Sequence, residues 1–161
     1  MRTLQIVGRK KSGKTSLIVR LLPLLRDRGL RVGTVKHSSH PHPLDRPGSD
    51  SMQHREAGSE ATLVITAAAV ALHFPVPEDP GPLIERFLGD LDLVLIEGWK
   101  ERPGTKIEVV PADRKGHPRE PVHAGLLAVV SSPGLRERVD GGFLWDEVDR
   151  VADVIWEWYR R

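Results

Sequence analysis

GRKKSGKT, residues 8–15, fits the pattern G-x-x-x-x-G-K-[ST]. The apolar run TLQIV (3–7) precedes it and predicts a strand, while TSLIVRLLPLLRDRG (15–29) follows it with apolar residues at helical spacing. A strand, a glycine-rich loop and a helix in this order are typical of a phosphate-binding loop, the P-loop. The sequence therefore predicts a fold built around this loop.

The residue types in the loop suit the binding of a nucleoside triphosphate. Glycines at 8 and 13 allow backbone angles and a close approach that a Cβ would obstruct. The loop amides and the helix N-terminus then face the phosphates. Lys14 is expected to bridge the β- and γ-phosphate oxygens and to act in catalysis, and the Thr15 hydroxyl is expected to bind Mg²⁺. The predicted nucleotide-binding residues are Gly8, Arg9, Lys10, Lys11, Ser12, Gly13, Lys14, Thr15 and Ser16.

A P-loop also needs an acidic partner for Mg²⁺ at the end of a buried strand. LDLVLIEG (91–98) reads as such a strand because its apolar residues run on without alternation, and it ends at Glu97. In open α/β sheets ligands bind at the carboxyl ends of the strands, which favours Glu97 as a metal-site residue, acting through a bound water. The alternative is a loop carboxylate paired with Lys100 or Arg102. Asp92, at the start of this strand, is expected to be structural.

The base that the nucleotide carries is not determined by these residues. The guanine-recognition sequence N-K-x-D is absent from the chain. VVSSPG (129–134) follows a buried strand at the ligand end and could present backbone groups to a base. The residues alone therefore indicate a nucleoside triphosphate and Mg²⁺ without choosing between GTP and ATP.

The remainder of the chain alternates short β-branched runs with helix-like stretches, which predicts an α/β fold. We expect a three-layer P-loop NTPase, with a mostly parallel central sheet flanked by helices, in a single domain over 1–161. Pro23 predicts a kink or a break in the first helix, which Gly29 is placed to end. The remaining strands are expected at 31–37, at 106–110 as an outer strand, at 126–132, and at 62–66 with 70–74 as a hairpin, for which helix is the alternative. The remaining helices are expected at 50–58, 82–90 and 146–161. A polar loop is expected at 112–121.

Composition narrows the class of protein further. The 24 Lys and Arg residues nearly balance the 22 Asp and Glu residues, and aromatic residues make up only 5%. Scattered basic residues and few aromatics argue against nucleic-acid binding. Zero cysteines exclude disulfides and thiolate chemistry. Because there is no signal-peptide core and no apolar run approaches ~18 residues, we expect a cytoplasmic protein that does not span a membrane.

Several blocks together resemble one family. GRKKSGKTSLIVRLLPLL, RVGTVKHSSH, DRPGSDSMQHREAG, DLVLIEGWK and TKIEV occur in the order seen in the molybdopterin-guanine dinucleotide biosynthesis protein B (MobB) family. They cover most of the first 110 residues. This chain has Ser49 where the family often has Lys, and Met52 and Gln53 where it often has Trp-Arg. Contacts that the family's Lys or Trp-Arg makes at these positions are therefore not expected in this chain.

The resemblance implies a homodimeric protein that binds GTP and Mg²⁺ and hydrolyses GTP weakly. It implies an accessory role, as an adapter or delivery factor for the MobA-type nucleotidyltransferase, which joins GMP to molybdopterin. Molybdopterin or its guanine dinucleotide would be a further ligand. The chain would not itself be the transferase.

Two features of KHSSHPHPLDRPGSD (36–50) remain open between roles. Asp50 falls where related P-loop proteins place a switch carboxylate that acts on Mg²⁺ or the attacking water. It is thus a candidate catalytic and metal residue, or else the N-cap of the helix that follows. The imidazoles of His37, His40 and His42 suit Ni²⁺ or Zn²⁺, which would indicate a metallochaperone GTPase. The sequence is also compatible with a small-molecule P-loop kinase, with its basic residues in 113–119, and with a pure adapter that binds nucleotide without useful turnover.

Overall fold

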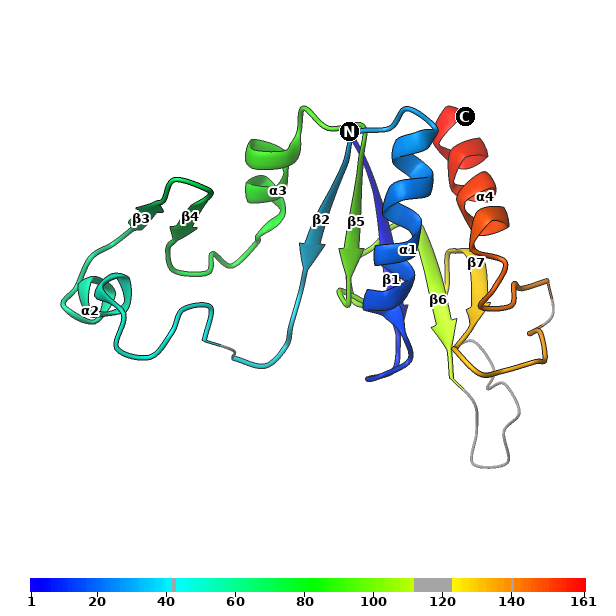
Figure 1. Ribbon diagram of the computed structural model, residues 1–161, viewed down its shortest axis with the longest axis horizontal. Helices are drawn as coiled ribbons and strands as arrows, with labels where there is room; N and C mark the ends of the chain where they lie inside the picture. Colours follow the sequence, from blue (N-terminus) through cyan, green and yellow to red (C-terminus); the bar gives the residue numbers. More distant parts are fainter. Residues whose placement is uncertain (42, 112–122, 140) are drawn as a thin grey trace. The chain divides into compact units, whose positions relative to one another are not determined.

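The computed structural model describes residues 1–41, 43–111, 123–139 and 141–161 (Figure 1). The chain groups into two compact units. The first unit contains residues 1–38 and 84–161, and the second unit contains residues 39–83. The single domain expected over 1–161 stays a prediction.

The first unit is built on a parallel sheet of five strands in the order β2-β5-β1-β6-β7. All carboxyl ends of these strands therefore meet at one edge, and β1 lies at the centre. The loop at residues 8–13 leaves β1 at this edge. The strands are β1 Arg2–Gly8, β2 Val32–Lys36, β5 Leu93–Glu97, β6 Lys106–Val110 and β7 Leu126–Ser131.

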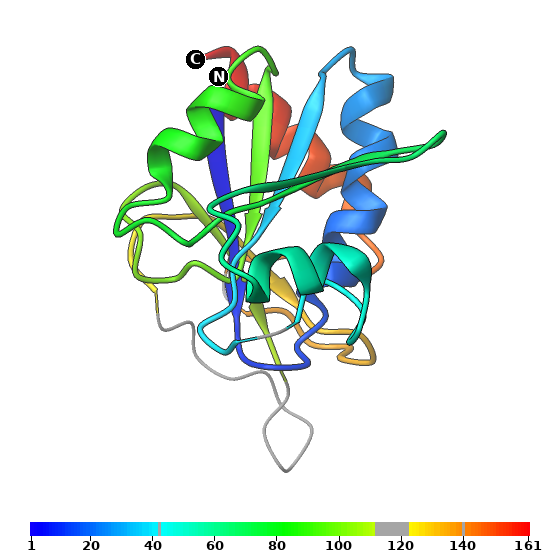
Figure 2. The same cartoon turned by 90° about the vertical axis from the view of Figure 1, so that its left-hand side faces the viewer.

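Helices cover both faces of this sheet, as Figure 2 shows. On one face, α1 Lys14–Asp27 and α4 Val148–Arg160 pack on the main apolar core with the inward residues of the strands. On the other face, Ile84 of α3 Gly81–Leu88 packs with Val94 and Ile96 of β5. These three layers confirm the predicted fold class.

Helix α1 forms because Leu17, Ile18, Leu21 and Leu25 share one buried face. It runs through Pro23 without interruption, so of the two alternatives at Pro23, a kink or a break, the break is wrong. Proline removes one hydrogen bond to the carbonyl of Val19, a residue on the exposed side of the helix where water can replace the missing donor. Gly29 ends the helix as predicted. Its φ is +85°, and the amide of Leu30 donates back to the Leu25 carbonyl at 3.2 Å.

Strand β6 is wrongly predicted as an outer strand. It pairs with β1 on one side and β7 on the other, and all five of its residues are buried. Its alternating charges are satisfied inside the protein. The Lys106 ammonium donates to the carbonyls of Arg102 (2.9 Å) and Gly104 (3.3 Å), and Glu108 accepts from the His123 amide at 3.1 Å. Polar alternation therefore marks a hydrogen-bonded layer here rather than a solvated face.

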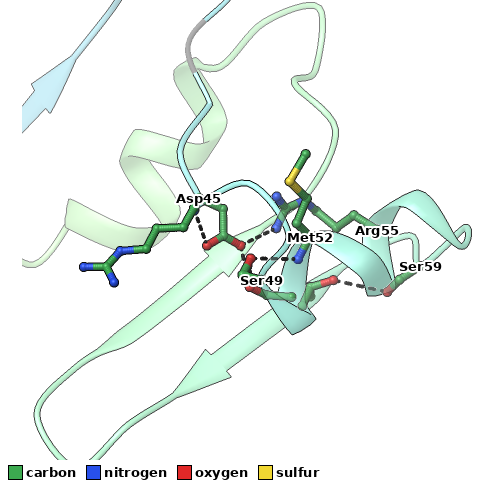
Figure 3. Close-up of polar contacts among 8 residues, drawn as sticks. Asp45, Ser49, Met52, Arg55 and Ser59 are labelled. Carbon is green, nitrogen blue, oxygen red and sulfur yellow. Dashed lines mark hydrogen bonds and ion pairs between the residues drawn. The ribbon is translucent and has the colours of Figure 1, made fainter.

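The second unit contains α2 Asp50–Glu56 and a two-stranded hairpin of β3 Thr62–Ile65 and β4 Val70–His73. The hairpin prediction is confirmed, and the helix alternative at these residues is wrong. The N-cap of α2 is Ser49, whose hydroxyl accepts from the Met52 amide at 3.3 Å (Figure 3). Asp50 is the first residue inside the helix, so its capping alternative is wrong.

Asp45 organises the turn that leads into α2 (Figure 3). Its carboxylate accepts from the hydroxyl of Ser51 and from Arg55, whose Nη1 lies 3.2 Å away. The backbone amide of Arg46 adds a further hydrogen bond at 2.9 Å. These donors, led by the Ser51 hydroxyl, lower the pKa of Asp45 to about 2. Within the D-x-P-G-x-D-S motif, Asp45 thus has a clear structural role.

Among the described residues, no helix is long and apolar enough to cross a membrane.

Candidate phosphate and metal site

The P-loop has a backbone that only glycine can follow at its two key positions. Gly8 has a φ of +138°, and a Cβ there would lie 2.4 Å from the Val109 carbonyl oxygen. Gly13 has a φ of +104°, and a Cβ there would lie 2.9 Å from Cδ of Pro133. Lys11 also has a positive φ, of 63°. Successive turns of this kind direct amides toward a common centre, as anion-binding loops require.

Trp145 and Pro133 hold the loop from the side of the β7–α4 connection. The Trp145 ring lies 3.2 Å from the position of a Gly13 Cβ. Arg20 of α1 donates to the Trp145 carbonyl at 2.6 Å and lies over its ring, 5.2 Å from the centroid. Sequence reasoning missed Trp145 because no motif connects it with a glycine so far away in the chain.

Lys14 and Thr15 stand at the first turn of α1, where Gly13 provides no side-chain cap. The Lys14 ammonium donates to the carbonyls of Arg9 at 2.6 Å and Gly8 at 3.2 Å. Burial lowers the pKa of Lys14, the Glu97 carboxylate opposes this shift, and Lys36 adds to it. Lys36 and Glu97 therefore share the electrostatic environment of the P-loop lysine.

Glu97 ends β5 beside the P-loop, as predicted. Its Oε1 accepts a hydrogen bond of 2.8 Å from the Thr15 hydroxyl. The alternative of a pair with Lys100 or Arg102 is wrong, because Lys100 pairs with Glu101 and Arg102 lies over the Trp99 ring. Asp92 is structural, as expected. Its Oδ2 accepts from the Arg31 amide at 2.7 Å at the opposite edge of the sheet.

A cavity of about 260 Å³ opens at this point. It is lined by Lys11, Gly13, Lys14, Thr15, Ser16 and Glu97. Because the Thr15 hydroxyl donates its hydrogen bond to Glu97, its oxygen lone pairs stay available for a cation. Ser12 adds a hydroxyl that is buried and makes no hydrogen bond with the described residues. A larger cavity of about 530 Å³ lies at the far end of α1, among mostly apolar side chains such as Leu22, Leu30 and Leu91, and offers no comparable chemistry.

The predicted site residues divide into four groups, of which Gly8 and Ser12 form one: they belong to the loop but do not line the cavity. The structure brings Lys11, Gly13, Lys14, Thr15, Ser16 and Glu97 together around the cavity. The side chains of Arg9 and Lys10 are exposed, and neither lines it. Asp50 belongs to the second unit, so its switch and metal roles stay predictions.

The candidate base-reading segment lies close to the P-loop through Pro133. However, the amides of Ser131 and Ser132 already donate to the carbonyls of Phe143 (2.8 Å) and Val110 (2.9 Å). Backbone recognition of a base by 129–134 therefore stays a prediction, with fewer free donors than the sequence suggested.

The metallochaperone and kinase interpretations gain no support from the described residues. They contain no group of three or more His, Cys, Asp and Glu side chains that could hold a metal ion. His37 instead stacks on Trp99, with ring centroids 4.9 Å apart. His42, and the basic residues at 113–119 on which a kinase lid would depend, lie outside the described residues.

The sequence model of the family described as "Molybdopterin guanine dinucleotide synthesis protein B" matches residues 3–132. The chain belongs to this family, MobB. The resemblance seen in the sequence blocks is thereby confirmed. The molybdopterin-guanine dinucleotide biosynthesis adapter protein of Escherichia coli (strain K12) is 35% identical over 159 residues, which cover 93% of this chain and 89% of the relative. Its namesake from Haemophilus influenzae is 33% identical and covers 96% of this chain and 88% of the relative.

Solved MobB structures have the same fold. A crystal structure of molybdopterin-guanine biosynthesis protein B superposes with a TM-score of 0.69 at 32% identity, over 99% of both chains. The crystal structure of Bacillus subtilis MobB gives a TM-score of 0.72 at 27% identity, over 96% of this chain and 98% of the other. The predicted sheet and helix layers thus belong to the MobB fold.

Proposed function

We propose that this chain binds GTP and Mg²⁺ at the P-loop and acts as an adapter in the synthesis of molybdopterin-guanine dinucleotide. The observation that carries the proposal is the Thr15–Glu97 hydrogen bond of 2.8 Å beside the Lys14 ammonium. A hydroxyl oriented by a carboxylate and a neighbouring ammonium are the groups that a magnesium-bound triphosphate requires. The adapter role is supported by the names of the relatives from Escherichia coli and Haemophilus influenzae.

The geometry supports a separate role for each residue of the site. Lys14 would exchange its carbonyl partners for β- and γ-phosphate oxygens, which are stronger acceptors because they are charged. Thr15 would bind Mg²⁺ directly, and Glu97 would hold a metal-bound water. Hydrolysis would be weak, because among the described residues that line the cavity only Glu97 carries a carboxylate that could activate water. This carboxylate is already hydrogen-bonded to the Thr15 hydroxyl. Asp50 is the residue that we propose to complete the metal site or to orient the attacking water.

Membership of the family supports the choice of partners. We propose a MobA-type nucleotidyltransferase, which attaches GMP to molybdopterin, as the protein served by this adapter in the cytoplasm. Molybdopterin or its guanine dinucleotide would be the delivered ligand. The chain itself would form a homodimer and would not be the transferase.

The second unit offers a surface for the homodimer. In the β3–β4 hairpin, Leu63 faces Leu72 and Ile65 faces Val70, and all four side chains are exposed. Residues directly opposite each other in an antiparallel pair lie on the same face. The hairpin therefore presents an uninterrupted apolar face, and a two-stranded sheet of this kind needs a partner for stability.

The test is a calorimetric titration of the full chain with GTP and with ATP, in the presence of Mg²⁺. We expect GTP to bind at least about tenfold more tightly, a difference of ~1.4 kcal/mol. Repeating the GTP titration with the purified transferase should change the affinity, because two coupled ligands affect each other equally. Equal affinity for ATP would contradict the choice of GTP. An affinity unchanged by the transferase would contradict nucleotide-linked adapter action.

A further inference from the structure

Within the first unit, Trp99 packs beside the residues at which the chain leaves for the second unit and returns from it. The ring lies two residues after Glu97 and stacks on His37, with centroids 4.9 Å apart and planes 6° apart. The guanidinium of Arg102 lies 4.7 Å from the Trp99 ring centroid. Trp99 thus has two polar stacking partners, and its ring orientation is fixed from both the β2 end and the β5–β6 connection.

The chain passes into and out of the second unit next to residues that contact the Trp99 ring or pack in the same cluster. It leaves the first unit after Ser38, directly beyond His37, and returns at Ile84. Ile84 is buried with Val94 and Ile96, and Trp99 packs against this cluster. One side chain therefore contacts the apolar cluster at the return point and the imidazole at the exit point.

The backbone between Glu97 and Trp99 leaves little room for independent movement. The His37 amide donates to the Glu97 carbonyl at 2.9 Å, and the Gly98 amide donates to the Ile6 carbonyl at 3.1 Å. Gly98 has a φ of +90°, and a Cβ there would lie 2.9 Å from the His37 carbonyl oxygen. A backbone displacement at Glu97 would therefore act on the hydrogen bond to His37 and on the position of Trp99.

We propose that Trp99 is a positioning residue that transmits the ligand state of the phosphate site to the second unit. A magnesium-bound triphosphate changes the contact between Thr15 and Glu97, the end of β5 moves with it, and Trp99 alters the packing at His37 and at the Ile84 cluster. The inference rests on the proposed nucleotide binding. It adds a response of residues 39–83 to that nucleotide.

Hydrogen–deuterium exchange of the full chain, with and without Mg²⁺ and GTP, tests the proposal. In the unsubstituted chain we expect GTP to slow exchange over 8–16 and to change exchange over 39–83. In Trp99→Leu the effect over 8–16 should remain, while the effect over 39–83 should fall at least about fivefold, the lower end of ordinary coupling between sites. Trp156→Leu is the matched control, because Trp156 also stacks on a ring and lies under an arginine, but on α4. It should retain both effects.

The outcomes separate the two proposals. If GTP does not slow exchange over 8–16 in the unsubstituted chain, the result would contradict nucleotide binding itself. Protection over 8–16 without any change over 39–83, or an undiminished change in Trp99→Leu, would overturn the role of Trp99 alone. If Trp99→Leu does not fold, His37→Leu removes the stacking partner and leaves Trp99 in its cluster. The same fivefold loss over 39–83 is then expected, and its absence would overturn the proposal.

Discussion

The hydroxyl of Thr15 is the residue-scale feature on which the metal site depends. It donates to Glu97 at 2.8 Å and so keeps its lone pairs for a cation. A methyl group in the same place would have the same volume and no lone pairs. The residue therefore offers a way to separate metal binding from phosphate binding.

We predict that Thr15→Val lowers GTP affinity in the presence of Mg²⁺ at least about tenfold, because losing a direct ligand should cost no less than losing an outer-shell partner of a metal site. Affinity in excess EDTA should stay nearly unchanged, because the loop amides and Lys14 remain. Calorimetry under both conditions measures the difference. Thr15→Ser, which keeps the hydroxyl, is the control and should bind like the unsubstituted chain. An undiminished magnesium effect in Thr15→Val would refute the metal role.

Glu147 is the second residue with a predictable signature. It accepts from the Leu144 amide at 2.8 Å and pairs with Arg138 and Arg150, each at 2.6 Å. The Leu144 amide first, and then Arg138, lower the pKa of Glu147 from 4.5 to about 2. A lowered carboxyl pKa stabilises the folded state above the unfolded pKa, and the gain is lost as the pH falls from about 4.5 toward 2.

We therefore expect Glu147→Gln to lower the melting temperature at pH 7, with a difference from the unsubstituted chain that shrinks as the pH approaches 3. Thermal unfolding followed by circular dichroism at several pH values measures this. Glu157→Gln, on the exposed side of α4, is the control and should change little at any pH. A difference that stays constant from pH 7 to pH 3 would show that the ion pairs do not stabilise the fold.

At this scale the sequence predicted well wherever a motif fixes the chemistry. Five of the predicted loop residues and Glu97 meet around one cavity because the motif and the strand end both dictate position. Trp145 could not be predicted, since its contact with Gly13 depends on how the β7–α4 connection folds back. The N-cap alternative for Asp50 is wrong by one position, because Ser49 and Asp50 are both good N-caps.

At the scale of elements, local sequence patterns predicted whether a segment is a helix or a strand better than they predicted whether it is buried. Hydrophobic runs identified β5 and α4 correctly. The polar alternation of β6 suggested exposure, yet Lys106 and Glu108 find buried partners in connections that are distant in the sequence. Pro23 likewise lies in a helix that the packing of Leu21 and Leu25 maintains. Tertiary contacts overrode the local signal in both cases.

The β3–β4 hairpin carries the element-scale prediction. Ile65→Lys, at the turn end of this apolar face, should weaken a homodimer at least about tenfold, because a buried unpaired charge opposes association. Sedimentation at micromolar concentration should then show a shift from dimer to monomer. Ala61→Lys, an exposed position outside the paired strands, is the control and should leave the mass unchanged. A full dimer in Ile65→Lys would exclude this face as the dimer surface.

At the scale of the whole molecule, the candidate functional features lie in two compact units. The first unit has the sheet and the P-loop, and the second has Asp50 and the hairpin. Sequence alone predicted one domain, because no linker composition marks the junctions at 38 and 84. The parallel sheet could be predicted from the alternation of elements. The grouping of 39–83 could not, because it depends on which contacts form in space.

The central claim is nucleotide binding at the P-loop, and the affinity of Lys14→Ala for GTP tests it most directly. Calorimetry with Mg²⁺ should show at least about a 30-fold loss, since a charged hydrogen bond of this kind contributes ~2–3 kcal/mol. An unchanged circular dichroism spectrum would confirm the fold. Lys100→Ala removes the same charge from an exposed pair with Glu101 and should bind GTP normally. Undiminished GTP affinity in Lys14→Ala would contradict the assignment of the P-loop as the nucleotide site.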